Sequence, residues 1–220
     1  MNKFNKLTSM TNKQINSMRR GRPPRSADQI TASRNTIIQA ARELFAIHGY
    51  NGVSMRKIAG KANCLPATLY ALFPSKRELL NQILEVVYID LTIQLEECYK
   101  TSSESDRLEN LCLVQLNFWV NRPGDYKAIL LIEDTYLDFE EEYCSKKSAI
   151  FQLEIYTRVI REAQSRGKLK AGSPEEIRSI LLCTILGIAL SMINIPKYHL
   201  KISEKIKENS IRALIAGLKQ

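Results

Sequence analysis

Hydrophobic residues recur at intervals of three and four along most of this chain, which is the spacing of amphipathic helices. No stretch alternates apolar and polar residues in the manner of a half-buried strand. Polar segments and segments that contain Gly or Pro separate the apolar runs. Beyond residue 78 the pattern predicts helices over residues 79–99, 106–120, 123–138, 141–166, 174–194 and 203–218. The predicted fold class is therefore all-α.

Residues 53–76 have the pattern of two short helices joined by a tight turn. Ser54 can cap the first helix, and Asn63 readily accepts the left-handed conformation that a sharp helix exit needs. Pro66 suits the first turn of the second helix, where its missing N–H costs nothing. This arrangement predicts a helix-turn-helix, which places its second helix in the major groove of DNA. An ordinary helical hairpin would show a similar local pattern.

The wider block from residue 34 to residue 84 resembles the DNA-binding domain of the TetR family of bacterial transcriptional regulators (TetR/AcrR type). Three segments carry the resemblance: AARELFAIHGY, VSMRKIA and ATLYALFPSK. It implies an N-terminal three-helix helix-turn-helix domain at residues 33–93. It also implies a C-terminal helical domain for ligand binding and dimerisation at residues 94–220, with the helix between them transmitting the signal.

The resemblance also assigns DNA contacts to individual residues. Thr68, Tyr70 and Lys76 match positions that hold phosphates in the family, and Ser54 can add a contact at its helix start. The positions that face the bases are Leu65, Pro66, Ala67, Ala71 and Leu72. These side chains form no bidentate hydrogen bonds with bases and mainly touch thymine methyl groups, so we expect an A·T-rich operator. Leu65 is also a poor helix cap.

Positive charge is concentrated at the N-terminal end. Residues 1–80 hold 14 Lys and Arg against three Asp and Glu, whereas the remaining residues hold 18 against 20. Residues 1–32 read as a flexible basic arm, and residues 19–25 within it resemble an AT-hook. In that motif Arg20 and Arg22 would enter a narrow A·T minor groove. A generic basic tail is the alternative interpretation.

The chain shows no pattern typical of an enzyme or a metal site. Its five cysteines lack C-x-x-C spacing and its two histidines lie far apart, so we expect no metal and no cofactor. No nucleophile elbow or phosphate-binding glycine loop is present. We therefore predict a cytoplasmic protein that is not an enzyme.

Residues 179–196 carry no charge and are almost long enough to span a bilayer. Polar residues inside the run and the lack of an aromatic belt argue against a membrane span. Thr184, Gly187 and Ser191 form a face of small residues along which another helix can approach. The resemblance implies that the last two long helices pack against their copies in a homodimer. In the final helix the expected contacts include Ile211, Leu214 and Leu218.

A ligand pocket is harder to place from sequence. Aromatic side chains and one carboxylate gather around the break at residues 122–124, a combination compatible with an apolar or cationic ligand. The candidate residues are Cys112, Leu116, Trp119, Tyr126, Glu133 and Tyr136. The alternative interpretation is that these aromatics are ordinary core.

The sequence thus predicts a ligand-responsive DNA-binding transcriptional regulator, acting as a repressor that a small molecule releases from DNA. A homodimer would place two recognition helices in successive major grooves about 34 to 36 Å apart, so the operator should be an inverted repeat. An architectural DNA-binding protein that senses no ligand is the main alternative. A membrane-anchored regulator built on residues 179–196 is a third hypothesis.

Overall fold

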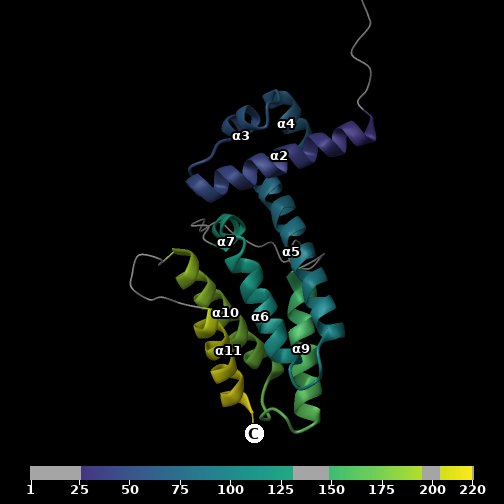
Figure 1. The fold of residues 1–220 in the computed structure, drawn as a ribbon. Coiled ribbons are helices and arrows are strands. Elements are labelled where there is room, and N and C mark those ends of the chain that lie inside the picture. The colour runs from purple at the N-terminus through teal and green to yellow at the C-terminus, as the bar shows by residue number, and fades with distance from the viewer. Residues whose placement is uncertain (1–25, 131–148, 195–203, 220) are drawn as a thin grey trace, which may run out of the picture. The chain divides into compact units, whose positions relative to one another are not determined.

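The computed structural model describes residues 26–130, 149–194 and 204–219, and in these residues it contains helices, turns and a single isolated bridge between Leu169 and Lys219. Figure 1 shows the helices in order along the chain. The all-α prediction is confirmed for the described residues. The helices are α2 (Ala27–His48), α3 (Met55–Lys61), α4 (Pro66–Leu72), α5 (Lys76–Thr101), α6 (Arg107–Val120), α7 (Pro123–Leu130), α9 (Ala149–Ser165), α10 (Pro174–Asn194) and α11 (Glu204–Leu218).

Residues 1–36 form a unit of their own by their contacts, and the structure describes this unit from Ser26 onward. The Ser26 hydroxyl accepts a hydrogen bond from the Gln29 backbone N–H, and the Gln29 side chain accepts one from the Ser26 N–H, both at 3.2 Å. This capping box starts α2 at Ala27. Residues 27–32, which the sequence pattern assigned to a flexible arm, are therefore helical. Arg20 and Arg22 lie outside the described residues.

Residues 37–220 form the second unit, which contains the hydrophobic core. Its N-terminal part buries Phe45 of α2, Ile58 of α3 and Leu69 of α4 completely. The two short helices have only seven residues each, too few to be stable alone. Burial of their apolar faces against α2 and α5 therefore holds them in place.

Helix α5 runs without interruption for 26 residues from the helix-turn-helix into the C-terminal bundle. Its buried stripe repeats at helical spacing from Leu79 to Cys98. The predicted domain boundary between residues 93 and 94 falls inside this continuous helix. The two predicted domains thus share one structural element.

Helix α6 lies at the centre of the bundle and packs against α5, α7, α9, α10 and α11. Its bounds differ by one residue from the predicted helix, and those of α10 agree with the prediction. Helix α7 ends within the described residues at Leu130, and the rest of the predicted helix over residues 123–138 lies outside them.

Helix α10 is long and apolar enough to cross a membrane by length and composition, and it is the one such helix among the residues described. Only 22% of its most apolar 18-residue window is buried inside the protomer. A helix that is apolar on all sides and mostly uncovered needs a further apolar partner.

Candidate functional site

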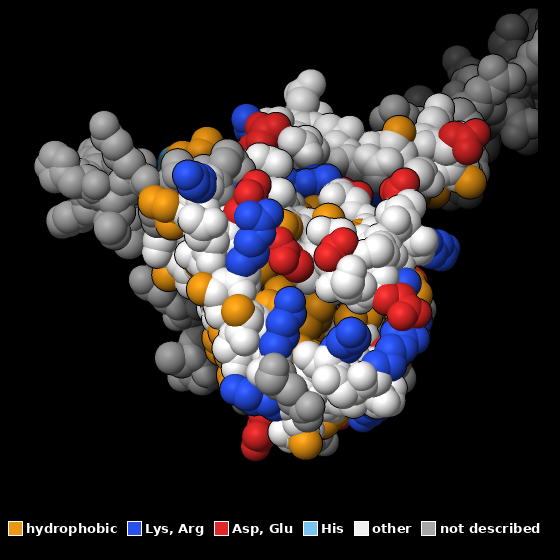
Figure 2. All heavy atoms as spheres, turned by 60° about the horizontal axis from the view of Figure 1, so that its bottom comes forward, with side chains coloured by type: hydrophobic (Ala, Val, Ile, Leu, Met, Phe, Trp, Pro, Cys, Tyr) orange, Lys and Arg blue, Asp and Glu red, His pale blue; other side chains and the backbone are white. Residues whose placement is uncertain are grey.

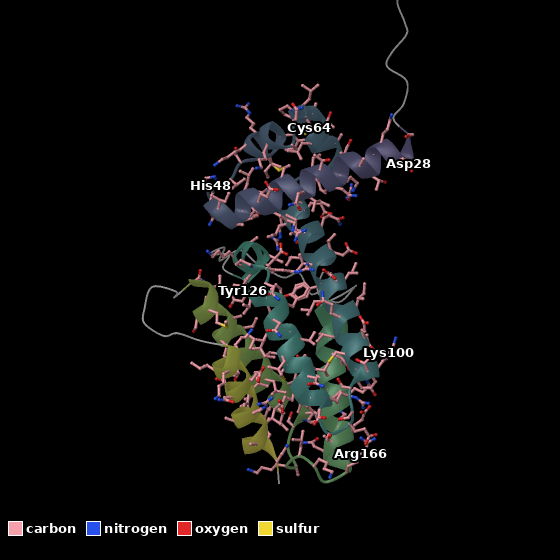
Figure 3. The ribbon with its side chains drawn as sticks, viewed as in Figure 1. Asp28, His48, Cys64, Lys100, Tyr126 and Arg166 are labelled. Carbon is pink, nitrogen blue, oxygen red and sulfur yellow. The ribbon has the colours of Figure 1, made fainter. Side chains whose placement is uncertain are left out.

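The turn between α3 and α4 has the geometry that the sequence predicted. Ser54 caps α3, and its hydroxyl accepts a hydrogen bond from the Lys57 N–H at 3.2 Å. Asn63 has a φ of +50°, which confirms the left-handed conformation expected there. The next N–H, of Cys64, donates to the Ala59 carbonyl at 3.0 Å and closes the end of α3. Figure 3 labels Cys64 in this turn.

Helix α4 presents an apolar outer face. It begins at Pro66, and the preceding Leu65 gives it no side-chain cap, as its sequence indicated. Four of the five predicted base-facing residues are exposed, and Leu65 is 74% exposed. The exposed four are Leu65, Pro66, Ala67 and Ala71. Leu72 is half-buried and packs against the core, so its side chain is shared between the helix surface and the interior.

The residues predicted to hold DNA phosphates differ in how exposed their side chains are. Tyr70 is 50% exposed and Ser54 is exposed, whereas Thr68 is half-buried. The Lys76 ammonium group donates to the backbone carbonyls of Tyr50 at 3.0 Å and Val53 at 3.2 Å. It also lies 4.0 Å from the centroid of the Tyr50 ring. Lys76 therefore ties the loop between α2 and α3 to the start of α5, a role that its sequence did not reveal.

We expect Lys76→Met to lower the free energy of unfolding by about 1 to 2 kcal/mol, because two carbonyls lose a charged donor. If Lys76 served only to bind DNA phosphates, the substitution would leave the free energy of unfolding unchanged. Thermal denaturation of Lys76→Met beside Lys57→Met, which removes an exposed lysine of α3, measures the difference. Equal melting temperatures for both variants and the parent protein would contradict a role in the loop.

Charge is distributed differently at the two ends of residues 37–220. In the helix-turn-helix, Arg56 and Lys57 are exposed, while Lys61 pairs with Glu43 at 2.7 Å and its hydrogen bond lowers the pKa of that carboxyl. Figure 2 looks toward the lower end of the view in Figure 1 and shows Lys, Arg, Asp and Glu side chains interspersed there. Surface pairs such as Arg166 with Glu104 account for this mixture.

The candidate pocket residues within the described part of the chain are all buried. They are Cys112, Leu116, Trp119 and Tyr126. Glu133 and Tyr136 lie outside the described residues. The four buried residues belong to the hydrophobic core, as the alternative interpretation expected. Burial raises the pKa of the Cys112 thiol to about 12, so this group stays protonated and unreactive at neutral pH.

An aromatic cluster surrounds Trp119. Tyr88, Phe118 and Tyr126 each make an edge-on contact with its ring, with centroids 5.2 to 6.0 Å apart. The Tyr126 hydroxyl donates to the Leu186 carbonyl of α10 at 2.8 Å, and Figure 3 labels Tyr126 on α7. Trp119 and Tyr126, both named as candidate pocket residues, are therefore in direct contact.

An open groove of about 440 Å³ lies between α5 and α6 on a different face of α6. Its lining includes Gln94 and Thr101 of α5 and Asn110 and Asn117 of α6. None of the four buried candidate residues lines it. The groove is therefore a separate surface feature from the aromatic cluster.

Helix α7 joins the helix-turn-helix to the bundle through polar contacts that sequence reasoning missed. Arg42 of α2 donates to both carboxylate oxygens of Asp125, at 2.9 and 2.6 Å, and the Asp125 side chain is only 7% exposed. Arg122, just before α7, pairs with Asp90 of α5. A β-carbon on Gly124 would lie 3.3 Å from the Ala46 side chain, so the glycine allows close packing of α7 on α2.

The exposed face of α10 is rotated from the one predicted. Ile180, Cys183, Gly187 and Leu190 form the exposed stripe. Thr184 and Ser191 are half-buried, and their hydroxyls donate to carbonyls of their own helix at 2.9 Å. Of the three predicted contacts, Gly187 alone is fully on the exposed side.

The three predicted contacts of α11 differ in how far the protomer itself covers them. Ile211 is completely buried in the core of its own protomer, and Leu214 and Leu218 are half-buried against it. The exposed side of α11 carries Ile206, Ala213, Ala216 and Gly217. The sequence identified apolar residues on α11 but not which surface covers each of them, because α11 also packs on α6.

Comparison with known proteins identifies the DNA-binding part. The family model described as bacterial regulatory proteins of the tetR family matches residues 37–83. A solved structure from Shewanella sp. PV-4, assigned to the tetR family, has a TM-score of 0.70 at 19% identity over 86% of this chain and 98% of that chain. Residues 37–83 therefore match the TetR family of bacterial regulatory proteins, and the chain shares the fold of TetR-family structures.

Two further comparisons are with proteins named as transcriptional regulators. The TetR-family transcriptional regulator HI0893 from Haemophilus influenzae RD has a TM-score of 0.65 at 23% identity, over 89% of this chain and 100% of that chain. The HTH-type transcriptional regulator YuxN of Bacillus subtilis strain 168 is 33% identical over 115 residues, which are 50% of this chain and 38% of YuxN. The chain thus matches less than half the length of this curated relative. At 19% and 23% identity, the two solved structures show that this chain shares their fold.

Proposed function

We propose that this TetR-family protein is a transcriptional repressor that binds an A·T-rich palindromic operator as a homodimer and is released by a small molecule. The left-handed turn at Asn63, which sets α4 against α3 in a TetR-type helix-turn-helix, is the observation that carries DNA binding. The relatives compared with it are named as transcriptional regulators. We infer that it is not an enzyme and acts in the cytoplasm.

The apolar outer face of α4 supports an A·T-rich operator. Leu65, Ala67 and Ala71 are exposed there, and they offer methyl groups rather than hydrogen-bond donors or acceptors. Among base edges in the major groove, the thymine methyl is the apolar partner. Base specificity then depends on methyl contacts and DNA shape, with Ser54, Thr68, Tyr70 and Lys76 assigned to positioning on phosphates.

A homodimer is supported by the uncovered apolar stripe of α10. Ile180, Cys183, Gly187 and Leu190 would contact their copies, together with the exposed side of α11. This assignment replaces Thr184, Ser191 and Ile211 as central contacts. The apolar character of α10 then has an explanation that requires no membrane.

Helix α7 supports a route by which a ligand could affect DNA binding. Tyr126 of α7 contacts Trp119 in the core, and its neighbour Asp125 holds Arg42 of α2. A ligand that displaces the Tyr126 ring would therefore also move the partner of Arg42. Energetic coupling of about 1 to 3 kcal/mol is typical of such linkage.

Footprinting on genomic DNA tests the proposed function. A repressor protects a palindrome with half-sites about one helical turn apart. An architectural protein, the alternative, protects many A·T-rich sites without symmetry. Protection of scattered sites alone would overturn the repressor proposal.

We expect deletion of residues 19–25 to weaken operator binding by about tenfold or more, because Arg20 and Arg22 would no longer enter the minor groove. The deletion leaves the Ser26–Gln29 capping box intact, so α2 can still begin at Ala27. Arg20→Gln/Arg22→Gln is the finer variant, and it should reduce the slope of log affinity against log salt by about 2 to 4 per dimer. Unchanged affinity, selectivity and salt slope would show that the arm has no role.

A further inference from the structure

Among the described residues, three side-chain atoms of α6 are buried without a hydrogen-bond partner: Nε of Arg107 at the helix start, and two atoms further along the helix. The two further along are the indole Nε1 of Trp119, a donor, and the amide Oε1 of Gln115, an acceptor. The two residues are 1% and 4% exposed. They are four positions apart on the helix, so their side chains lie side by side on one face. Buried groups of this kind are rare in native proteins and require an explanation.

The surroundings of these two atoms are aromatic. Tyr88, Phe118 and Tyr126 enclose the Trp119 ring. A molecule bound there would have flat or cyclic apolar surface to match these rings. It would also carry one group that both accepts from Trp119 and donates to Gln115, and a hydroxyl group does both.

Charge at this place argues for a neutral molecule. In the described residues the buried charged side chains are Asp125 and Lys207. Asp125 is paired with Arg42, and the Lys207 ammonium group donates to Asn117 at 2.7 Å. A charged ligand would need a buried partner of opposite sign, because an unpaired buried charge is strongly unfavourable.

We propose that the α6 core binds a neutral aromatic alcohol or phenol whose hydroxyl group accepts a hydrogen bond from Trp119 Nε1 and donates one to Gln115 Oε1. The proposal rests on the proposed function, since it names the class of molecule that controls the regulator. It replaces the cationic ligand that the sequence allowed. Entry beside Trp119 moves the Tyr126 ring and, through α7, the Asp125 carboxylate that holds Arg42.

Three probes of similar size separate the chemical alternatives: benzyl alcohol, toluene and benzylammonium. Trp119 is the only tryptophan of the chain, so its fluorescence reports binding directly in the full-length protein without DNA. We expect benzyl alcohol to bind about tenfold more tightly than toluene, since it gains two hydrogen bonds. Benzylammonium should bind more weakly than either.

Gln115→Leu provides the decisive variant. It keeps the approximate size of the side chain and removes the acceptor, so the preference for benzyl alcohol over toluene should disappear. Gln115→Met serves the same purpose if the leucine variant fails to fold by circular dichroism. Gln94→Leu, in the separate groove between α5 and α6, is the matched control and should keep the preference.

Several results would overturn the proposal. They are equal affinity for benzyl alcohol and toluene, tighter binding of benzylammonium, a preference that survives in both Gln115 variants, or no change in Trp119 fluorescence with any probe. The last result would mean that water alone satisfies the two atoms. The binding measurements contain no DNA and are therefore independent of the footprinting experiment. If benzyl alcohol binds as expected but footprinting finds no palindromic operator, the proposed repressor function is rejected and the binding site beside Trp119 still stands.

Discussion

Ile180→Asp should convert the protein to a monomer and lower its affinity for a palindromic operator by about 100- to 10,000-fold. Ile180 is 47% exposed in the α10 stripe, and a carboxylate there would meet the apolar surface of a second α10. A dimer holds two recognition helices on one operator, so the second binds as an intramolecular event. A monomer loses that advantage even though its own helix-turn-helix is unchanged.

Sedimentation velocity gives the oligomeric state, and fluorescence anisotropy with a labelled operator gives the affinity. Ile93→Asp is the matched control, because Ile93 is a 60% exposed isoleucine on α5, away from the α10 stripe. The control should remain dimeric and bind normally. If Ile180→Asp stays dimeric with full affinity, α10 does not form the interface.

Asp125→Ala should lower the free energy of unfolding by about 3 kcal/mol. The substitution leaves Arg42 without its carboxylate partner in a place where the pair is mostly buried, and breaking such a pair typically costs 3 to 5 kcal/mol. The lower end applies because the Arg42 side chain is 25% exposed. Chemical denaturation monitored by Trp119 fluorescence measures the change.

The double variant Arg42→Met/Asp125→Leu isolates the cause. Replacing both partners by apolar side chains removes the stranded charge and should recover most of the lost stability. Glu104→Ala breaks the exposed pair with Arg166 and should cost less than about 1 kcal/mol. A double variant as unstable as Asp125→Ala would mean that packing around α7, rather than charge pairing, explains the loss.

The same pair explains a limit of sequence reasoning. Arg42 and Asp125 are 83 positions apart, and a single sequence offers no means of joining them. Local features were predictable because they depend on neighbouring residues: the cap at Ser54, the left-handed Asn63 and the bounds of α10. The TetR fold followed from the local motifs of the helix-turn-helix.

The errors have physical causes of the same kind. The Ser26–Gln29 capping box was overlooked, so residues 27–32 were assigned to the flexible arm rather than to α2. Thr184 was named as an interface residue because it is small, and in the protomer it is half-buried beside the exposed stripe of α10. Ile211 was named as a dimer contact because it is apolar, but it is completely buried within the protomer. The packing of α11 on α6 determines which of its apolar side chains face inward. Helix rotation is set by tertiary contacts rather than by periodicity.

The unbroken length of α5 has a mechanical consequence. At 26 residues it is about 39 Å long, so a tilt of about 5° at its bundle end displaces its other end by about 3.4 Å. In a symmetric dimer the two displacements would add to about 7 Å, a substantial part of the roughly 34 Å between successive major grooves. Under the proposed function, a helix of this length would amplify a small rearrangement beside Trp119 into a misfit between the protein and its operator.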